Sequence, residues 1–322
     1  MPASSWSDVV RELKLPETPE TILQACLRLK AEGHLREALS GLEEVMRRDE
    51  RHVTALREMT GVLRQLARPR EAEAVERRRI AAEADQIFLR ALQHIGEDGD
   101  VTQRYLAACT RLAPGHEGIG FIEALLGLAP PPARIPEAIV SMLADQQAAR
   151  YDWHSRTVWR CQSPQLLFDA VAAEATETLQ DLEMADIGCG TGLGAEPFAG
   201  RVMRIDGVDL APQMVDRAFR RRLHDESSQP LYVDLEVDNF VAWLRRRVER
   251  YDLVLAADAL ESIGALEPVF VAATAALRPA GLLAFSYETS QEPGPSFSPR
   301  HGFRHNPFMV RRALSTAGLD IL

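Results

Sequence analysis

The chain has 322 residues, which is long enough for two domains of ordinary size, and its hydrophobic content of 46% is normal for a globular protein. Its 37 basic and 47 acidic residues give a formal net charge of −10. Because a protein that follows a phosphate backbone carries a basic surface, this charge argues against nucleic acid as the main partner.

Cysteine usage and apolar patterning indicate a cytoplasmic protein. The four cysteines are widely spaced and form no C-x-x-C pair, so we expect neither a metal site nor a disulfide framework. The N-terminus lacks the basic start and apolar core of a signal peptide. No apolar stretch reaches the roughly 18–20 residues that a membrane span needs, so we expect no membrane partner.

The first third of the chain reads as helices with short connections. After a tail over residues 1–18, the helical region covers residues 19–128, and within it Gly33–Ala38 recurs 34 residues later as Ala67–Ala72. This period is typical of tetratricopeptide repeats, so we expect an all-α, tetratricopeptide-like domain. Its concave surface would dock a protein partner or mediate self-association. The alternative is a helical spacer that only covers the next domain.

A second domain is expected after a proline-rich linker at residues 129–136, which cannot continue a helix. In residues 137–322, short apolar strands alternate with amphipathic helices from Met184 onward. This alternation predicts an α/β, Rossmann-like domain with a parallel sheet covered on both faces. The expected strands lie near residues 183–187, 203–208, 231–233, 251–260 and 282–286.

Glycines gather where the first of these strands ends, in the run Asp186-Ile187-Gly188-Cys189-Gly190-Thr191-Gly192. A glycine-rich turn from strand to helix lets a ligand approach the backbone, and the helix start offers free N–H groups. The dinucleotide pattern G-x-G-x-x-G fails, because Leu193 takes the place of its last glycine. Asp209 follows the second strand, where a carboxylate accepts hydrogen bonds from a ribose diol. Both NAD sites and sites for S-adenosylmethionine (SAM) use such an acid.

The pattern D-x-G-x-G-x-G resembles motif I of the class I SAM-dependent methyltransferases. The resemblance covers residues 151–322. More narrowly, the chain is similar to the bacterial predicted methyltransferases that carry N-terminal tetratricopeptide repeats. Besides the glycines it rests on Tyr151–His154, Ala256–Leu260, Leu277–Ser286 and Phe303–His305. It implies SAM as the cofactor and methyl transfer as the reaction.

The resemblance also implies roles for single residues. Asp186 would lie near the methionine ammonium, Asp209 would hold the ribose, and Asp234 would accept from the adenine amino group, with Glu236 and Asp238 as substitutes. The full set of expected cofactor contacts is Asp186, Gly188, Cys189, Gly190, Gly192, Asp209, Leu210, Asp234, Leu235 and Asp258. An acceptor of high pKa would need a general base, and the candidates are His305, His154, Tyr287 and Asp258.

Several of these residues have plainer interpretations. Asp234 would then cap the helix that follows it, His154 would be an ordinary interfacial histidine, and His305 would face solvent. The arginine runs at residues 220–222 and 245–247 fall at predicted helix ends, where we interpret them as a solvated face that favours the helix dipole.

One departure from the class concerns the C-terminus. The class core has seven strands, whereas here residues 319–322 would supply a sixth and no sequence remains for a seventh.

We therefore expect a SAM-dependent methyltransferase whose acceptor is a small molecule or a protein, with a slight preference for a small molecule. The first rival is a non-catalytic SAM-binding scaffold or sensor that acts through the repeats. The second is an NAD-dependent oxidoreductase, which Leu193 and the acid-bearing third strand disfavour.

Overall fold

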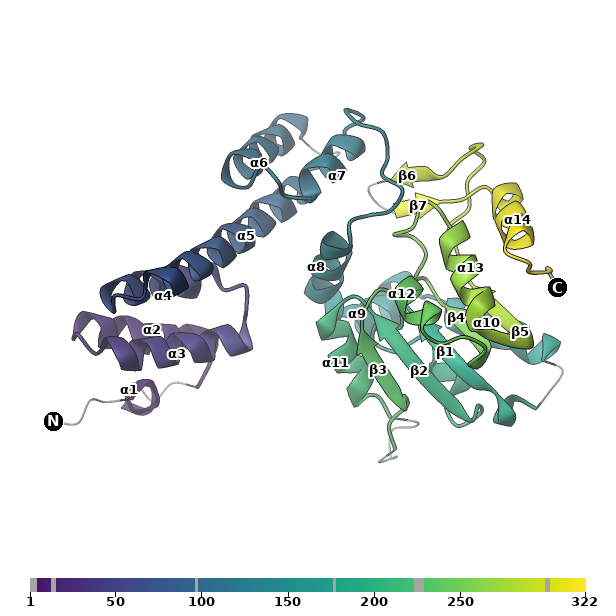
Figure 1. Cartoon of the computed structure of the whole chain (residues 1–322), viewed down its shortest axis with the longest axis horizontal. Coiled ribbons are helices and arrows are strands. Elements are labelled where there is room, and N and C mark those ends of the chain that lie inside the picture. The colour runs from purple at the N-terminus through teal and green to yellow at the C-terminus, as the bar shows by residue number, and fades with distance from the viewer. Residues whose placement is uncertain (1–4, 13–15, 96–97, 176–177, 223–228, 299–301) are drawn as a thin grey trace. The chain divides into compact units, whose positions relative to one another are not determined.

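A computed structural model of the chain describes residues 5–12, 16–95, 98–175, 178–222, 229–298 and 302–322. The chain folds into two compact units, Met1–Ile122 and Glu123–Leu322 (Figure 1). No helix within the described ranges combines the length and the apolar character that crossing a bilayer requires. Each unit is described by itself.

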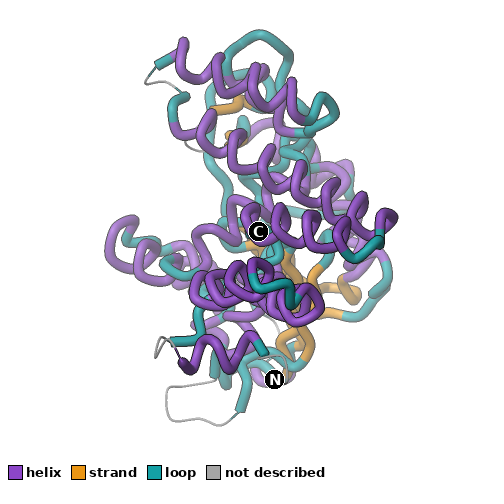
Figure 2. Tube along the Cα trace, turned by 90° about the vertical axis from the view of Figure 1, so that its left-hand side faces the viewer, coloured by secondary structure: helices purple, strands orange, loops and turns teal. Residues whose placement is uncertain are grey.

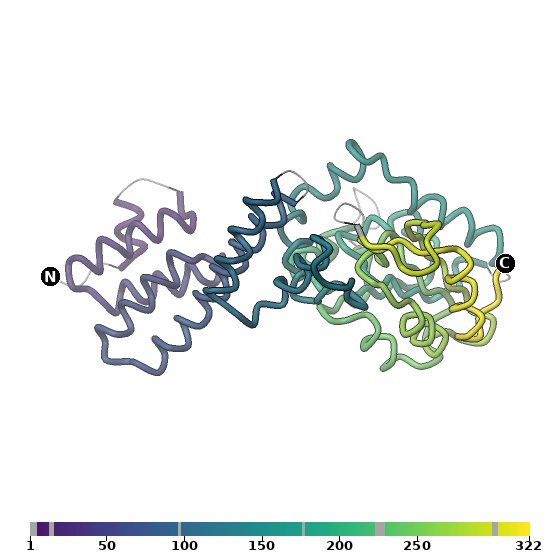
Figure 3. The backbone as a smooth tube through the Cα atoms, turned by 90° about the horizontal axis from the view of Figure 1, so that it is seen from above, coloured from purple at the N-terminus to yellow at the C-terminus, as the bar shows by residue number. Residues whose placement is uncertain are grey.

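The first unit is built from helices. They are α1 (Trp6–Glu12), α2 (Pro19–Ala31), α3 (Leu35–Arg48), α4 (Val53–Gln65), α5 (Pro69–Gln93), α6 (Gly99–Leu112) and α7 (Gly118–Leu125), whose last residues pass the boundary. Figure 2 shows helices in purple. Each helix from α2 to α5 packs on the next, and the colour in Figure 3 traces this order along the chain. The helices α2 and α4 start 34 residues apart, as do α3 and α5. Assignment to the tetratricopeptide class stays a prediction.

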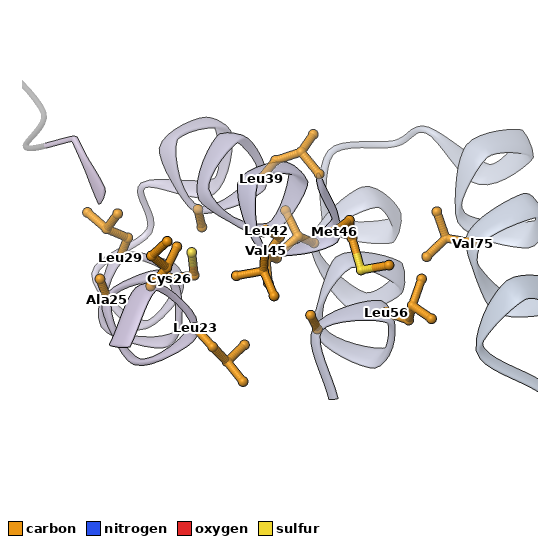
Figure 4. Close-up of a cluster of buried hydrophobic side chains, with 14 of the residues drawn as sticks. Leu23, Ala25, Cys26, Leu29, Leu39, Leu42, Val45, Met46, Leu56 and Val75 are labelled. Carbon is orange, nitrogen blue, oxygen red and sulfur yellow. The ribbon is translucent and has the colours of Figure 1, made fainter. Parts of the chain in front are cut away.

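The core of this unit lies between these helices, where apolar side chains recur on one face of each. In Figure 4, Leu42 and Val45 of α3 point toward Cys26 of α2. A Cβ at Gly41 would come within 2.4 Å of the Cys26 Sγ, so the close approach of α2 and α3 requires glycine there. Leu56 and Val75 continue the same cluster into α4 and α5.

The second unit is an α/β domain. Its strands are β1 (Glu183–Ile187), β2 (Arg204–Asp209), β3 (Asp234–Val237), β4 (Tyr251–Ala256), β5 (Leu277–Phe285), β6 (Ser296–Ser298) and β7 (Gly302–Arg304). Its helices are α8 (Glu137–Ala148), α9 (Tyr151–Trp153), the π-helix η1 (His154–Trp159), α10 (Ser163–Glu174), α11 (Pro212–Arg220), α12 (Phe240–Arg245), α13 (Glu267–Ala276) and α14 (Pro307–Thr316). Two short 3₁₀ turns are η2 (Leu179–Asp181) and η3 (Glu196–Phe198).

The central sheet is parallel, with the order β3-β2-β1-β4-β5. On one face Met184 and Leu253 pack against Phe168 of α10, and on the other Val254 packs with Trp243 of α12 and Phe270 of α13. The Rossmann-like prediction is thereby confirmed. Strand order reverses between β1 and β4, and ligands of open α/β sheets bind at the carboxyl ends of strands beside such a switch point.

Two expected strands are not formed where they were predicted, and β5 (Leu277–Phe285) begins five residues before its expected start. Residues 231–233 precede β3, and Leu231 and Tyr232 are instead buried against the sheet. The prediction failed because β3 is an edge strand with acidic residues, whereas the apolar residues before it mark a packing contact. Residues 319–322 lie outside any strand, so the central sheet has five strands within the described residues and β5 forms its edge.

Candidate functional site

The glycine run forms the loop that follows β1. Gly188 has a φ of 65°, and a Cβ there would lie 2.5 Å from the Cβ of Ala259, so a side chain would collide with the segment after β4. Gly190 has a φ of 54°, and its missing Cβ would meet no atom within 4 Å. The loop therefore packs tightly at its first glycine and presents bare backbone to open space at its second, as ligand approach requires. Cys189 is buried between them, and its N–H donates to Val208 of β2 at 3.0 Å.

Asp209 ends β2 beside this loop. Its Oδ2 accepts the Gly190 N–H at 2.9 Å and its Oδ1 accepts the Ala211 N–H at 2.8 Å. Burial raises the pKa of this carboxyl above its ordinary value, and no cation pairs with it among the described side chains. A carboxylate has about four lone-pair sites, so acceptor capacity remains for a ligand. Leu210 follows it in a bend, half-buried.

Asp186 lies under the loop. It is buried, and the Tyr232 hydroxyl donates to its Oδ2 at 2.6 Å. Burial raises the pKa of Asp186 to about 7. The sequence did not single out Tyr232, which was expected only as part of a strand. The role of Asp186 toward an ammonium group stays a prediction.

The third strand requires a correction. Asp234 was expected at the carboxyl end of this strand, but it begins β3 in register with Asp206, whereas Val237 pairs with Asp209. The side chain of Leu235 packs over Gly207, 2.8 Å from where a Cβ would stand. Both residues therefore lie away from the strand end at which they were expected.

Asp238 occupies the position expected of Asp234. Its N–H donates to the Asp209 carbonyl at 3.0 Å, and its own carboxylate accepts from Arg246 at 2.6 Å and from the Asn239 N–H at 2.7 Å. The hydrogen bond from Arg246 holds the pKa of Asp238 below its usual range. This acid was named from the sequence only as a substitute.

The segment α9–η1 supplies Tyr151 and His154. Tyr151 packs beside Ala211 at the start of α11. Burial and the nearby carboxylates of Asp258, Glu261 and Asp209 raise the pKa of its hydroxyl. Tyr151 therefore faces the acids at the strand ends.

His154 belongs to an aromatic cluster of the same segment. Its ring stacks on Trp159 with centroids 5.7 Å apart and meets the edge of Trp153 at 5.0 Å. Both tryptophans are exposed, with 54% and 59% of their surface accessible.

Acids also follow β4. Asp258 has a φ of 50°, a strained backbone that clusters at functional sites. Its Oδ1 accepts from the Ser286 hydroxyl at 2.7 Å, and the Cys161 thiol lies 2.9 Å from its Oδ2. Asp258 thus joins the end of β5 to the segment after η1.

Glu261 follows the apolar run of β4, and from this place the sequence predicts that it faces the reacting region, together with Asp258. Burial raises its pKa to about 7, with further increase from the charges of Asp258 and Glu288. No cation pairs with it among the described residues. Its carbonyl accepts the Phe303 N–H at 2.7 Å, which ties the segment to β7.

His305 and Tyr287 lie together next to β7. Their ring centroids are 6.4 Å apart. His305 is buried, its burial lowers the pKa of the imidazole, and its Nε2 has no hydrogen-bond partner among the described residues. The alternative that His305 faces solvent is therefore wrong. The His305 N–H donates to the Glu288 carbonyl at 2.8 Å, and this hydrogen bond holds the residue in the interior.

Arg221 corrects the interpretation of the first arginine run as a solvated face. Its side chain is 14% exposed, whereas that of Arg220 is 72% exposed. The Arg221 Nε donates to the carbonyl of Thr191 in the glycine loop at 2.7 Å. A sequence run of three arginines contains no signal that separates the buried one from the exposed one.

Residues 185–283 match the family model of a methyltransferase domain. Among curated proteins, the chain is 35% identical over 107 residues to a ubiquinone biosynthesis O-methyltransferase of Methylobacterium sp. (strain 4-46), and 33% identical over 111 residues to one of Rhodopseudomonas palustris (strain BisB18). These alignments cover 33% and 34% of this chain, and the chain spans 41% of the length of each relative. The matched segment therefore resembles a methyltransferase domain.

Solved structures superimpose on about half of the chain, at lower identity. Magnesium protoporphyrin IX methyltransferase from Synechocystis PCC 6803 with bound SAH superimposes with a TM-score of 0.46 at 18% identity, over 58% of this chain and 90% of that chain. A putative sarcosine dimethylglycine methyltransferase from Galdieria sulphuraria gives 0.40 at 17% identity, over 49% and 61%.

Proposed function

We propose that the chain binds SAM at the carboxyl ends of β1 and β2 and transfers its methyl group to a hydroxyl of a small molecule. The observation that carries the cofactor part is the half-buried carboxylate of Asp209, which lacks a cation among the described residues and lies beside the open backbone of Gly190. The names of the curated relatives, which are O-methyltransferases, support a hydroxyl acceptor.

The residues at this end of the sheet fit the cofactor. Asp209 has lone pairs left for a ribose diol, and Asp238 stands beside it to accept from an adenine amino group. Gly190 leaves room for the amino-acid part, and the carboxylates around it favour a cationic ligand. When bound, SAM supplies an activated sulfonium methyl.

The acceptor would meet the acids after β4. Methyl transfer by in-line displacement asks the protein mainly to align the reacting groups and exclude water. Tyr151 would close the site from the side of α9. Glu261 would take the proton that the acceptor hydroxyl loses, because a base with a pKa near 7 is half-ionised at neutral pH. Asp258, Tyr287, His154 and His305 stay candidates for the same task.

The cofactor assignment is tested by calorimetric titration of the full chain with SAM, S-adenosylhomocysteine (SAH) and NAD. We expect micromolar binding of SAM and SAH and none of NAD. Binding of NAD alone would show an oxidoreductase site instead. With SAM binding established, labelled SAM and a panel of phenols and alcohols would reveal transfer, and binding without turnover on any acceptor would favour the scaffold alternative.

The helical unit has a second proposed role, in docking or self-association. A cavity of about 470 Å³ lies between the start of α2, the α3–α4 connection and α5, and Arg51, Arg57 and Arg90 are among its lining residues. Light scattering of the full chain, wild type and with Arg57→Glu and Arg90→Glu together, tests self-association. A dimer that the double variant dissociates is the expected result, and a monomeric wild type would contradict it.

A further inference from the structure

Arg221, which follows α11, connects three segments of the second unit. Its Nε donates to the Thr191 carbonyl at 2.7 Å, its Nη2 contacts Oδ2 of Asp152 at 2.5 Å, and its Nη1 contacts Oε1 of Glu196 at 3.0 Å. Thr191 belongs to the glycine loop, Asp152 to α9 and Glu196 to η3. A planar guanidinium can hold three such acceptors at once, whereas an ammonium cannot match that geometry.

On the loop side, Arg221 lies against the backbone of Gly192. A Cβ at Gly192 would stand 3.1 Å from Cδ and Nε of Arg221 and 2.9 Å from a ring carbon of Tyr232. The neighbouring Gly190 faces open space instead. Arg221 thus contacts the loop at Gly192 and leaves Gly190 free for a ligand.

On the α9 side, Asp152 is bound twice. Its Oδ2 contacts Arg221, and its Oδ1 accepts from the Thr191 hydroxyl at 2.5 Å. Tyr151, the residue before it, packs against Ala211, whose N–H donates to Asp209. The two bonds to Asp152 therefore fix the segment that places Tyr151 over the site.

The π-helix η1 joins the same network. The Arg156 Nη2 contacts both carboxylate oxygens of Glu196 at 2.7 Å, and Glu196 in turn contacts Arg221. All five residues of this network, namely Asp152, Arg156, Thr191, Glu196 and Arg221, lie within described segments. We name it the Arg221 network.

We propose that Arg221 is a positioning residue for the cofactor: it fastens α9 to the glycine loop, so that cofactor affinity depends on its contacts with Asp152 and Thr191. The inference rests on the proposed function, because it concerns the same site. It predicts an effect on ligand affinity that an ion network serving only folding would not produce.

The test compares the full-length wild type with Arg221→Met, Arg221→Lys, Asp152→Asn and the double variant Arg221→Met/Asp152→Asn, by calorimetric titration with SAH. Methionine keeps an apolar side chain of similar length and removes the guanidinium group with its N–H donors. We expect the SAH Kd to rise about tenfold for Arg221→Met and about threefold for Arg221→Lys and Asp152→Asn. The double variant should bind like Arg221→Met, because residues that share one interaction are not additive.

Arg220→Met is the matched control. Arg220 precedes Arg221, is exposed and pairs with Asp216 within α11. Its loss should leave the SAH Kd within about twofold, because exposed ion pairs contribute little. Hydrogen exchange adds a second readout: SAH should protect the peptide that contains α9 in the wild type and should protect it less in Arg221→Met.

The outcomes separate this inference from the proposed function. A wild type that does not bind SAH overturns the proposed function and this inference with it. A wild type that binds, with an unchanged Kd in both Arg221 variants, overturns the inference alone. A lower melting temperature with unchanged Kd and unchanged exchange at α9 would show that the Arg221 network serves only folding. The lysine variant keeps the test decisive if Arg221→Met fails to fold.

Discussion

Acidic residues lie at both ends of the parallel sheet, and the two ends differ in whether these acids pair with arginine. At the amino ends of the strands, Glu183 pairs with both Arg250 and Arg278, and Asp252 pairs with Arg278. The Arg278 Nη1 lies 2.6 Å from Asp252 and its Nη2 2.9 Å from Glu183. At the carboxyl ends of β2 and β4, Asp209 and the nearby Glu261 pair with no cation among the described residues.

The pKa directions follow this difference. Burial opposes ionisation of Glu183, but hydrogen bonds from Arg278 and Arg250 outweigh it and hold its pKa below the ordinary value. Burial raises the pKa of Asp209 and of Glu261 without such compensation. The acids at the amino ends of β1 and β4 therefore stabilise the fold through ion pairs, whereas Asp209 and Glu261 lack a cation and are candidates for ligand contact. Asp238, which follows β3 at the same end as Asp209, differs from both because it pairs with Arg246.

Removing the acid at the carboxyl end of β2 should have the largest effect. Asp209→Ala removes the proposed ribose contact and the acceptor for the N–H groups of Gly190 and Ala211. We expect SAH affinity to fall at least about 100-fold, which corresponds to about 2.7 kcal/mol. Calorimetry measures it, with Asp216→Ala, an exposed acid of α11, as the control. Unchanged affinity would remove Asp209 from the site.

Glu261 makes the same comparison testable by pH. Its folded pKa of about 7 exceeds the value of 4.5 for an ordinary glutamate, so its contribution to stability is fully present below pH 4.5 and is lost as pH rises through 7. Glu261→Gln cannot ionise, so the variant should gain stability over the wild type by about 2.5 kcal/mol between pH 5 and pH 8.

Thermal unfolding of both full-length proteins at pH 5 and pH 8 measures this gain. Asp186, whose pKa is also raised to about 7, is present in both proteins, so its effect cancels in the difference. An equal difference in melting temperature at the two pH values would show that Glu261 ionises normally.

The amino end should respond in the opposite manner. Glu183→Gln leaves Arg250 and Arg278 without their shared carboxylate, in a place where the Glu183 side chain is only 16% exposed. We expect the free energy of unfolding to fall by about 1.5 kcal/mol. The SAH Kd should stay within about twofold, because this acid lies at the far end of β1. Urea unfolding measures the first quantity and calorimetry the second. Weaker SAH binding by Glu183→Gln would contradict the expectation that acids at the amino end affect only stability.

The sequence predicted the parts of the fold that depend on local patterns. Buried parallel strands read as short apolar runs, so β1, β2 and β4 were found close to their true bounds. The edge strand β3 was misplaced, because it carries acids on a half-exposed ribbon and the apolar Leu231 and Tyr232 beside it are buried for another reason. A short polar edge strand has no hydrophobic period to detect.

The sequence likewise predicted some residues of the site and missed others. The glycine loop and Asp209 follow from a motif with fixed spacing, whereas Arg221 and Glu261 owe their environments to segments far away in the sequence. Arg221 meets Asp152 across 69 positions of the chain. Neither residue type nor spacing shows which arginine of a run is buried, so only the tertiary structure could reveal Arg221. The sequence placed Glu261 after β4, but its burial and raised pKa emerge only from the tertiary structure.

The smallest expected effect concerns the two acids at the ends of β3. Asp234 lies at the amino end, in register with Asp206, and Asp238 follows the carboxyl end beside Asp209. If position along the strand decides function, Asp238→Asn should weaken SAH binding about fivefold, or about 1 kcal/mol, through the lost adenine contact. Asp234→Asn should change the Kd by less than twofold, because it removes only a long contact to Arg247 at 3.5 Å. Calorimetry on both variants decides between them, and a larger loss for Asp234→Asn would restore the assignment made from the sequence.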